Sequence, residues 1–417
     1  MSMTPTNTQT AYWAAPVAMI LSIALLTTTA LTNIAMLALV LLSLWAWKNM
    51  QWQQQEWQLI KPLFLLIAAF CAWDLVLNLY FGNSLSESLT ALRHVRKLFF
   101  VVLLWPLFVI PKVSRLTLLS LGATVAVLAV ANIYFALVLH NTMMTSFMPN
   151  MHGQILVGMA LLSIHAAIHH PRWRWALLVL AAVLLTSLLL ASTRRTGYVL
   201  LGAGSVLLLI FEWMRQPKQH RMKYFFAGLL LMTGLLLFAM LSPNVQSRMA
   251  TMMTEYRQYF DATTDERSRM ATSIGLRLQY VYSSWLIIQD HFWMGVGSLN
   301  FKPLFWQVNQ ALGATDPVSF APNPHNEYAY MWATKGLIGL GLYVGIFIQA
   351  CRIAAHRADA WQREGLWLFV FLFAISIAFN SMSIDMVEGH FMMLVLLTFL
   401  APKQIWSDNP ASKDGVH

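Results

Sequence analysis

Charged residues are scarce in this sequence. Asp, Glu, Lys and Arg make up 11% of its 417 residues, whereas soluble domains carry about a quarter. Hydrophobic residues make up 58%, and the mean hydropathy is +0.58. This composition excludes a soluble globular protein, and the long apolar runs predict several membrane-spanning helices.

Cysteine is also scarce. The two cysteines, Cys71 and Cys351, fall in or at the ends of apolar runs, so we expect no disulfide in the polar part of the chain. The sequence has no Cys/His spacing of a zinc site, no Gly-x-Ser-x-Gly, no phosphate-binding P-loop and no Asp-x-Asp pair. We therefore expect chemistry without a cofactor and without a metal ion.

Apolar runs dominate the rest of the chain. Read with a window of about 19 residues, they number about twelve. They lie near 14–31, 33–48, 61–80, 97–111, 115–139, 153–169, 174–191, 197–213, 224–242, 327–351, 365–384 and 388–402. The predicted fold class is an all-α polytopic membrane protein with about twelve transmembrane helices.

The basic residues indicate an orientation. With a cytoplasmic N-terminus, the short outside loops hold only Arg93, Arg96, Lys97, Arg194 and Arg195, and the inside loops hold most of the others. Both termini are therefore predicted to be cytoplasmic. The net charge of +10 reflects this membrane anchoring, so we infer no nucleic-acid partner from it.

One polar segment is long enough to form a region of its own. We divide the chain into residues 1–241 with helices 1–9, residues 242–325 as a large outside loop with amphipathic helices, and residues 326–417 with helices 10–12 and a cytoplasmic tail. Long loops in compact proteins are usually functional. Within this loop, 280–288 is predicted to be a helix at or near the membrane surface.

His325 is the first candidate for chemistry, because it lies in Pro-Asn-Pro-His-Asn-Glu just before an apolar run. Pro324 restricts the backbone there. The following helix dipole favours a neutral imidazole that can accept a proton. The alternative is a capping or interfacial histidine, and Asn326 or Asn323 could do the capping instead.

Several arginines lie on the same predicted side. Arg194 and Arg195 interrupt a long apolar stretch, either as binders of an anion or as the turn between two helices. Arg277 begins the aromatic stretch that ends at Gly295-Val296-Gly297, and Arg257 lies earlier in the same loop. For both, the alternative is an arginine on the solvated surface.

The last outside hairpin carries Asp385, Glu388 and His390. Asp385 is a weaker candidate, because a carboxylate could orient the imidazole or hold an arginine, or simply belong to a polar turn. Together, the arginines suit a diphosphate and the histidine suits removal of a proton from a hydroxyl. This combination predicts glycosyl transfer from a polyprenyl-diphosphate donor.

Three segments resemble the O-antigen ligase and polymerase superfamily of Gram-negative bacteria. "PHNEYAYMWATKGLIGLGLY", with Gly336 and Gly339, is similar to its His-Asn and Gly-x-x-Gly helix. "STRRTGYVLL" is similar to its Ser-Arg-x-Gly segment, and "LRLQYVYSSWLIIQDHFWMGVGSLNF" to its arginine-containing loop. One departure is Lys335, because many members have an acidic residue there.

The resemblance implies a GT-C-like glycosyltransferase in the inner membrane, with its active site facing the periplasm. It implies His325 as general base, Arg195 and Arg277 as diphosphate binders, with Arg194 as their neighbour, and Asp385, Asn326 and Arg257 as weaker site candidates. The implied donor is O-antigen on undecaprenyl diphosphate, and the implied acceptor is the lipid A–core oligosaccharide, within the membrane lipids.

Three functions remain open at this point. One dominant loop favours a ligase over a polymerase, since polymerases more often show two comparable loops and the second candidate here, His140 to His152, is short. A transporter or flippase for a lipid-linked anion would also need arginines. It should show midplane charges and internal repeats, and we find neither in the sequence.

Overall fold

The computed structural model describes residues 5–25, 27–49, 54–138, 152–191, 195–241, 243–261, 264, 268–269, 272–314, 323–357 and 359–401. Regular structure in these ranges is entirely helical. This follows from the composition, because a helix satisfies its backbone hydrogen bonds internally and can therefore lie in an apolar surrounding.

The helices fall into two groups along the chain. The first group precedes the polar segment and contains α1 (Pro5–Ala24), α2 (Thr29–Asn49), α3 (Gln54–Tyr80), α4 (Leu85–Ala91), α5 (Arg96–Phe108), α6 (Pro111–Val138), α8 (His152–His169), α9 (Arg174–Ala191), α10 (Arg195–Arg215) and α11 (Arg221–Leu241). The second contains α12 (Pro243–Phe260), α14 (Ser273–Asp290), α15 (Ser298–Ala311), α16 (Glu327–Ala355), α17 (Ala360–Ile377) and α18 (Met386–Leu400). Short 3-10 turns lie at 92–94 and 171–173.

Every predicted apolar run falls on a helix, but twelve spans are not found. Among the described residues, seven helices are long and apolar enough to cross a membrane, and three shorter apolar helices lie at Tyr12–Ala24, Gly153–His169 and Met386–Leu400. The predicted span at 97–111 corresponds to α5, whose 13 residues are only about 20 Å long at 1.5 Å per residue. The chain is thus a multi-pass helical membrane protein.

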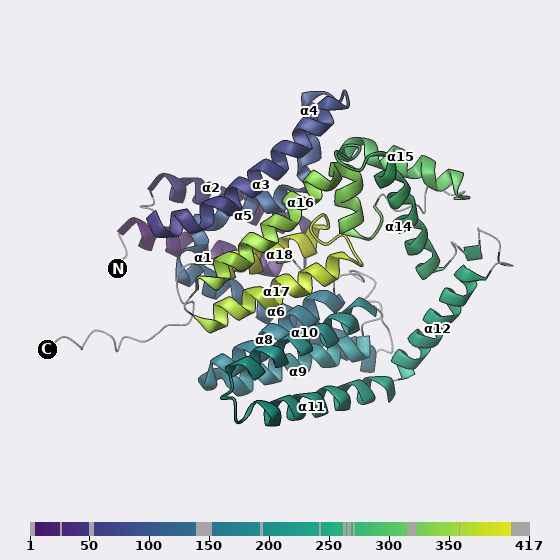
Figure 1. The fold of residues 1–417 in the computed structure, drawn as a ribbon. Helices are drawn as coiled ribbons and strands as arrows, with labels where there is room; N and C mark the ends of the chain where they lie inside the picture. The colour runs from purple at the N-terminus through teal and green to yellow at the C-terminus, as the bar shows by residue number, and fades with distance from the viewer. Residues whose placement is uncertain are drawn as a thin grey trace.

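The C-terminal helices form the centre of the bundle. α16 packs against α3 and α17, and α18 packs against α5, α6 and α17. α18 is buried from Val387 to Leu400, which is expected of a helix that is apolar on all sides and enclosed by others. Around this centre lie α1, α2 and α5 on one side and α8, α9 and α10 on the other, with α11 outermost (Figure 1).

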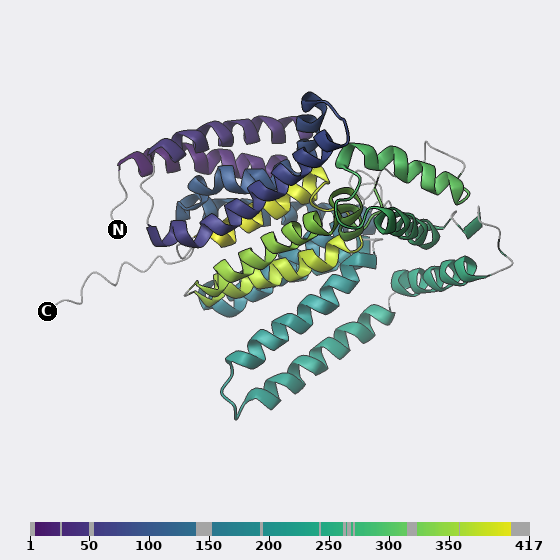
Figure 2. The ribbon, with the colours of Figure 1, turned by 45° about the horizontal axis from the view of Figure 1, so that its top comes forward.

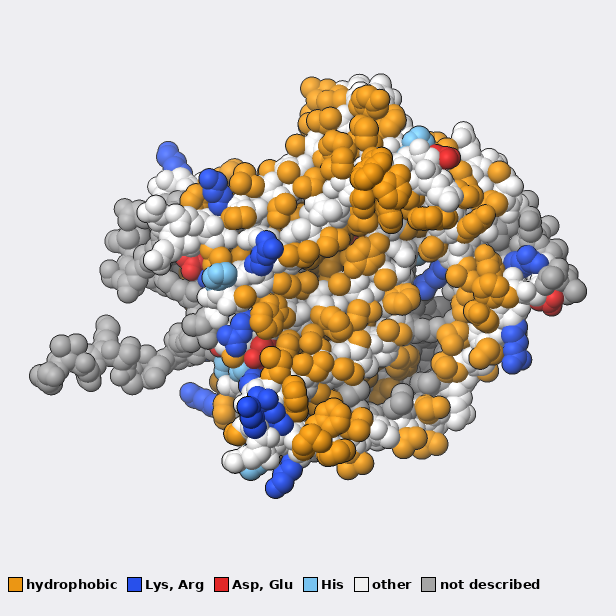
Figure 3. All heavy atoms as spheres, in the orientation of Figure 1, with side chains coloured by type: hydrophobic (Ala, Val, Ile, Leu, Met, Phe, Trp, Pro, Cys, Tyr) orange, Lys and Arg blue, Asp and Glu red, His pale blue; other side chains and the backbone are white. Residues whose placement is uncertain are grey.

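The polar segment 242–325 is largely helical. α12, α14 and α15 lie together beyond one end of the bundle, and α11 leads into α12 from the bundle's edge (Figures 1 and 2). The helix predicted at 280–288 is part of α14. On the face shown in Figure 3, hydrophobic side chains cover the bundle, while Lys and Arg gather towards its two ends.

α16 is broken at Gly336, where φ is +68° and ψ is −175°. The loop that precedes α15 fills the break. The amide N–H groups of Val296 and Gly297 donate to the carbonyls of Ala333 (3.0 Å) and Thr334 (2.8 Å), and Leu337 donates to Phe292 (2.9 Å). The polar segment is therefore hydrogen-bonded directly into a membrane helix, which satisfies backbone groups that the break would leave without partners.

Glycine is required on both sides of this contact. A Cβ on Gly336 would lie 2.0 Å from the carbonyl oxygen of Trp293, and one on Gly295 would lie 2.5 Å from the backbone nitrogen of Gly336. Both residues have positive φ angles, which glycine adopts at little cost. The Gly-Val-Gly sequence and Gly336 are thus two halves of one backbone junction.

Candidate functional site

A polar cavity of about 240 Å³ lies where the polar segment meets the bundle. Its walls come from five parts of the chain, and they are formed by Gln154, Thr196, Ser273, Leu276, Arg277, His325, Phe379 and Asn380. Two residues expected at the site, His325 and Arg277, therefore share one pocket, although they are 48 positions apart in the sequence.

Four helices begin at this pocket. Gln154, Thr196 and Ser273 lie in the first turns of α8, α10 and α14, and His325 lies two residues before α16. The first turn of a helix presents backbone N–H groups and a partial positive charge. Because four such ends and the Arg277 guanidinium surround one cavity, the pocket favours an anion.

The backbone of His325 has an unusual conformation. Its φ is +50°, the one positive value found at a non-glycine residue in the described part of the chain. Its N–H donates to Oδ1 of Asn323 at 3.0 Å, and Ser381 donates its hydroxyl to the same oxygen at 3.0 Å. A left-handed backbone conformation costs about 1–2 kcal/mol for most residues. These hydrogen bonds offset that cost and thereby fix the position of the His325 side chain.

The imidazole of His325 is half-buried and lies against Tyr280 of α14, with ring centroids 6.3 Å apart and ring planes at 23°. Tyr280 is 1% exposed and packs on Phe305 of α15, 5.4 Å away. Two helices of the polar segment thus support the imidazole from one side and leave its other side to the pocket.

Asn326, and not His325, caps the start of α16. It is the N-cap of α16, and its side-chain oxygen accepts from the N–H of Ala329 at 3.0 Å. This is the usual way in which asparagine satisfies a free N–H at a helix start. Since the helix is capped by its neighbour, His325 is not needed as a cap.

The next residue, Glu327, anchors the same segment to the hairpin between α17 and α18. Its carboxylate is fully buried and accepts from the hydroxyl of Tyr343 at 2.5 Å, from the N–H of Ser383 at 3.0 Å and from the Ser383 hydroxyl. The polar turn 378–385 is therefore tied to both Asn323 and Glu327. Sequence reasoning missed this role of Glu327, because its partners are 16 and 56 positions away.

Arg277 lies four residues after Ser273 on α14, so both project from one face of that helix. Both line the pocket, and Arg277 is half-buried. α14 begins with Thr272 as N-cap, whose hydroxyl accepts from the N–H of Gly275 at 3.0 Å. A well-defined helix start therefore fixes the position from which the guanidinium reaches the cavity.

The other predicted arginines are distributed differently. Arg195 is the first residue of α10, its side chain lies outside the described residues, and Arg194 lies outside them entirely. The neighbouring Thr196 lines the pocket, so the start of α10 lies at the cavity. Arg257 is exposed on α12 and is not part of the pocket wall. Most of the segment from His140 to His152 also lies outside the described residues.

Asp385 is not among the residues that form the pocket wall. It occupies the N-cap position of α18 without a side-chain capping bond. Burial raises the pKa of its carboxyl, and the charge of Lys97 partly opposes this rise. Lys97 is 3% exposed and donates to the carbonyl of Ile384. Asp385 therefore belongs to the charged packing that holds the hairpin.

Lys335, which stands where many members of the resembling superfamily have an acid, forms a buried ion pair. Its ammonium lies 3.0 Å from Oδ1 of Asp74 on α3, and it donates to the hydroxyl of Ser298 at 2.7 Å. Both side chains are 1% exposed. The pair joins α3, α15 and the broken α16, and it has no contact with the pocket wall.

Fold and pocket together define a multi-pass helical membrane protein with an anion-favouring pocket at one end of its bundle. Residues 180–344 match the family model described as O-antigen ligase. The match covers less than half of the chain, but it includes Arg194, Arg195, Arg277 and His325. No curated protein matches the chain significantly. The segment 180–344 is thus similar to the O-antigen ligase family, which contains both ligases and polymerases.

Proposed function

We propose that this protein is an O-antigen ligase, which transfers O-antigen polysaccharide from undecaprenyl diphosphate to a sugar hydroxyl of lipid A–core. The observation that carries the proposal is the convergence of four helix starts, Arg277 and His325 on one cavity. Such a cavity suits a reaction in which an anion leaves while a proton is removed.

In this proposal the positive groups bind the diphosphate of the donor. Arg277 and Arg195, with Arg194 beside it, donate to phosphate oxygens, and the helix N-termini add backbone donors. As the glycosidic bond breaks, negative charge develops on the leaving undecaprenyl diphosphate. Fixed positive groups stabilise that charge without having to reorganise during the reaction.

His325 is the proposed general base. The neutral imidazole takes the proton from the acceptor hydroxyl, the oxygen attacks the anomeric carbon, and undecaprenyl diphosphate departs from the opposite face. One bond forms as one breaks, so the configuration at that carbon is inverted. The backbone N–H of His325 donates to Asn323 Oδ1, which also accepts from the Ser381 hydroxyl, and these hydrogen bonds fix the backbone that carries the imidazole. General-base catalysis requires the base to be held close to the acceptor hydroxyl in this way.

The proposed orientation places the pocket in the periplasm of a Gram-negative bacterium, with both termini in the cytoplasm. The pocket lies at the end of the bundle where α8, α10 and α16 begin, and the start of α1 and the end of α18 lie towards the other end (Figure 1). The distribution of Lys and Arg in short loops supports this orientation.

The test is reconstitution of the purified protein with a short glycan on undecaprenyl diphosphate, with and without EDTA. Lipid A–core is offered as acceptor in one arm and a second lipid-linked glycan in the other. Glycan on the core despite EDTA is the expected result of a metal-independent ligase. A longer lipid-linked glycan would identify a polymerase, and the absence of any covalent product would overturn enzymatic transfer in favour of transport.

A further inference from the structure

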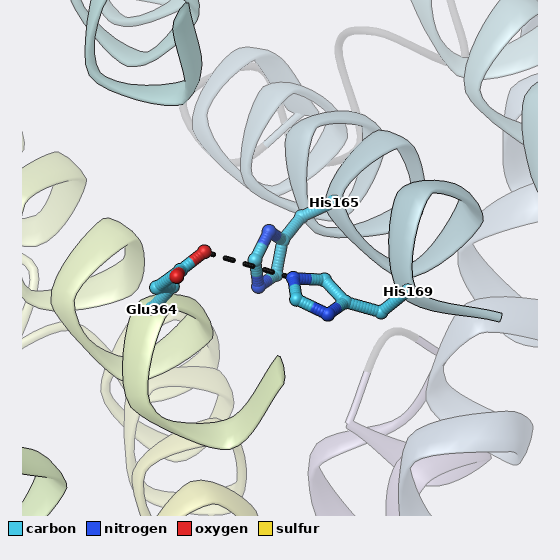
Figure 4. Close-up of side chains that lie close together, drawn as sticks. All are labelled: His165, His169 and Glu364. Atoms are coloured by element: carbon cyan, nitrogen blue, oxygen red, sulfur yellow. Dashed lines mark ion pairs between the residues drawn. The ribbon is translucent and has the colours of Figure 1, made fainter. Parts of the chain in front are cut away.

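A second cluster of polar residues lies at the opposite end of the bundle from the pocket. It contains His165 and His169, four residues apart on α8, and Glu364 on α17 (Figure 4). One ligand atom from each lies within 4.8 Å of the other two. His165 is fully buried, and the His169 and Glu364 side chains are 14% and 8% exposed.

The tautomer of His165 follows from its surroundings. Its Nε2 lies 3.1 Å from the carbonyl oxygen of Trp361. A carbonyl only accepts hydrogen bonds, so Nε2 carries the hydrogen and Nδ1 carries a free electron pair. Nδ1 is buried and has no hydrogen-bond partner in the described part of the chain. The indole of Trp361 stacks on the imidazole at 5.1 Å and fixes the ring.

This arrangement is typical of a metal ligand. Histidines that bind metals generally donate their other ring N–H to a carbonyl or carboxylate, which sets the tautomer and orients the ring. A buried nitrogen with no partner is otherwise costly. His165 therefore has both the supporting hydrogen bond and the free electron pair of a ligand.

The other two groups, His169 and Glu364, already contact the positively charged guanidinium of Arg215. Nη2 of Arg215 lies 2.7 Å from Nε2 of His169 and also contacts the Glu364 carboxylate, and its Nε lies 3.3 Å from Glu364 Oε1. A guanidinium only donates, so Nε2 of His169 must present its electron pair. The two groups that face Arg215 are thus one imidazole lone pair and one carboxylate.

We propose that His165, His169 and Glu364 form a binding site for a divalent transition-metal ion of the zinc class, for which the Arg215 guanidinium competes. Two imidazoles and one carboxylate suit such an ion, with water as the fourth ligand. Ligands about 2 Å from a tetrahedral ion lie about 3.3 Å apart. His169 Nε2 and Glu364 Oε2 are 3.6 Å apart, and all three ligand atoms lie within 4.8 Å of one another, so binding requires the ligands to approach by at most about 1.5 Å.

The Arg215 side chain can move away from Glu364 when the ion binds. Its side chain is 26% exposed and also contacts Glu212, three residues earlier on α10. On leaving Glu364, the guanidinium would keep its existing contact with Glu212. The ion then joins α8 to α17 at the end remote from the pocket, and the site is independent of the transfer reaction proposed above.

The test measures metal binding by the full-length, tag-free protein in detergent. The protein is stripped with EDTA and titrated with Zn²⁺ by calorimetry and with Co²⁺ by visible absorption. The wild-type protein should bind one ion per chain. His169→Gln should weaken binding at least tenfold, as loss of a ligand does. His356→Gln, which changes an exposed histidine outside the cluster, should leave the affinity unchanged.

Arg215→Gln distinguishes competition from simple coexistence. Removal of the guanidinium should tighten Zn²⁺ binding several-fold, and this gain cannot come from a folding defect. If neither the wild-type protein nor Arg215→Gln binds an ion stoichiometrically, or if His169→Gln binds as well as wild type, the cluster is an ion-pair network only and the proposal is overturned. Thermal melting of each variant without metal shows whether it is folded.

Discussion

The two ends of the bundle differ in the charged groups and helix termini that they contain. α8, α10 and α16 begin around the pocket, with His325 and Arg277 in its wall. At the other end, the chain pairs its arginines internally: Arg215 with Glu364, and Arg357 with Glu56. Helix starts attract anions and helix ends attract cations, so the direction of three helices divides the molecule into an anion-favouring end and a cation-rich end.

The difference separates two uses of an arginine. The guanidinium of Arg357 is 5% exposed, lies 3.0 Å from Glu56 Oε1 and donates to the carbonyl of Leu400 at 2.8 Å, so its contacts contribute to the fold. Arg277 is half-buried and lines the cavity, so a substrate in the cavity can reach it. Substitutions at the two ends should therefore change different measured quantities.

The largest expected effect is at His325. His325→Asn keeps a residue that tolerates the left-handed backbone but removes the base. Transfer in the reconstituted system should fall about 10²–10⁴-fold, with a melting temperature close to wild type. Near-normal transfer by a folded His325→Asn protein would refute the assignment of the base.

The junction at Gly336 should be the next most sensitive position. Gly336→Ala places a Cβ 2.0 Å from the Trp293 carbonyl oxygen at a positive φ, so we expect a loss of stability of more than about 4 kcal/mol, measured by denaturant or thermal unfolding. The matched control is Gly341→Ala in the same helix, where a Cβ meets nothing within 4 Å. Equal behaviour of the two variants would contradict the described junction.

Arg277→Lys keeps the charge but loses the two-pronged contact with a diphosphate. We expect kcat/KM for transfer to fall about 10²-fold, comparable to loss of one fixed donor, with little change in melting temperature. Arg257→Lys, on the exposed face of α12, should be almost neutral and serves as the control. Similar losses from both would indicate a general effect of surface charge.

Arg357→Lys tests the opposite end. The single ammonium of lysine lacks the two-pronged guanidinium that donates to Glu56 and to the Leu400 carbonyl at once. The free energy of unfolding should therefore fall by about 1–3 kcal/mol, as measured by unfolding curves. Transfer per folded molecule should be unchanged. A selective loss of transfer without a loss of stability would remove the distinction between the two ends.

The smallest expected effect concerns pH. Burial raises the pKa of Asp385 in the folded protein, so the fold favours the protonated carboxyl. Its contribution to stability is therefore full below the ordinary pKa of about 4 and is lost as the pH rises through the raised value. Asp385→Asn should gain melting temperature relative to wild type between pH 4 and pH 7. A relative loss would mean that the Lys97 charge outweighs burial.

Much of the helical framework follows from the sequence, because apolar runs and helix starts are local signals. The run from 327 to 351 lies within α16, and His325 and Arg277 line one pocket. The roles assigned to these two residues stay predictions. Twelve spans are not shown: seven helices among the described residues are long and apolar enough to cross, and the run 97–111 contains α5, which has only 13 residues. Hydropathy alone does not distinguish a buried short helix from a span.

What the sequence did not reveal depends on partners far away along the chain. Lys335 and Asp74 are 261 positions apart, and the break at Gly336 depends on a loop about 40 positions earlier. From the sequence we expected no metal-site spacing, although His165 and His169 stand four residues apart, because the third member, Glu364, comes from another helix. Only packing brings such groups together.

The central claim is that His325 and Arg277 have separate roles in one pocket. The most direct measurement records donor binding and transfer in the same vesicles, with labelled undecaprenyl-diphosphate glycan and wild-type, His325→Asn and Arg277→Lys proteins. The account predicts that His325→Asn binds the donor normally without transferring it, and that Arg277→Lys binds it weakly. Transfer by His325→Asn, or donor binding unaffected by Arg277→Lys, would contradict it.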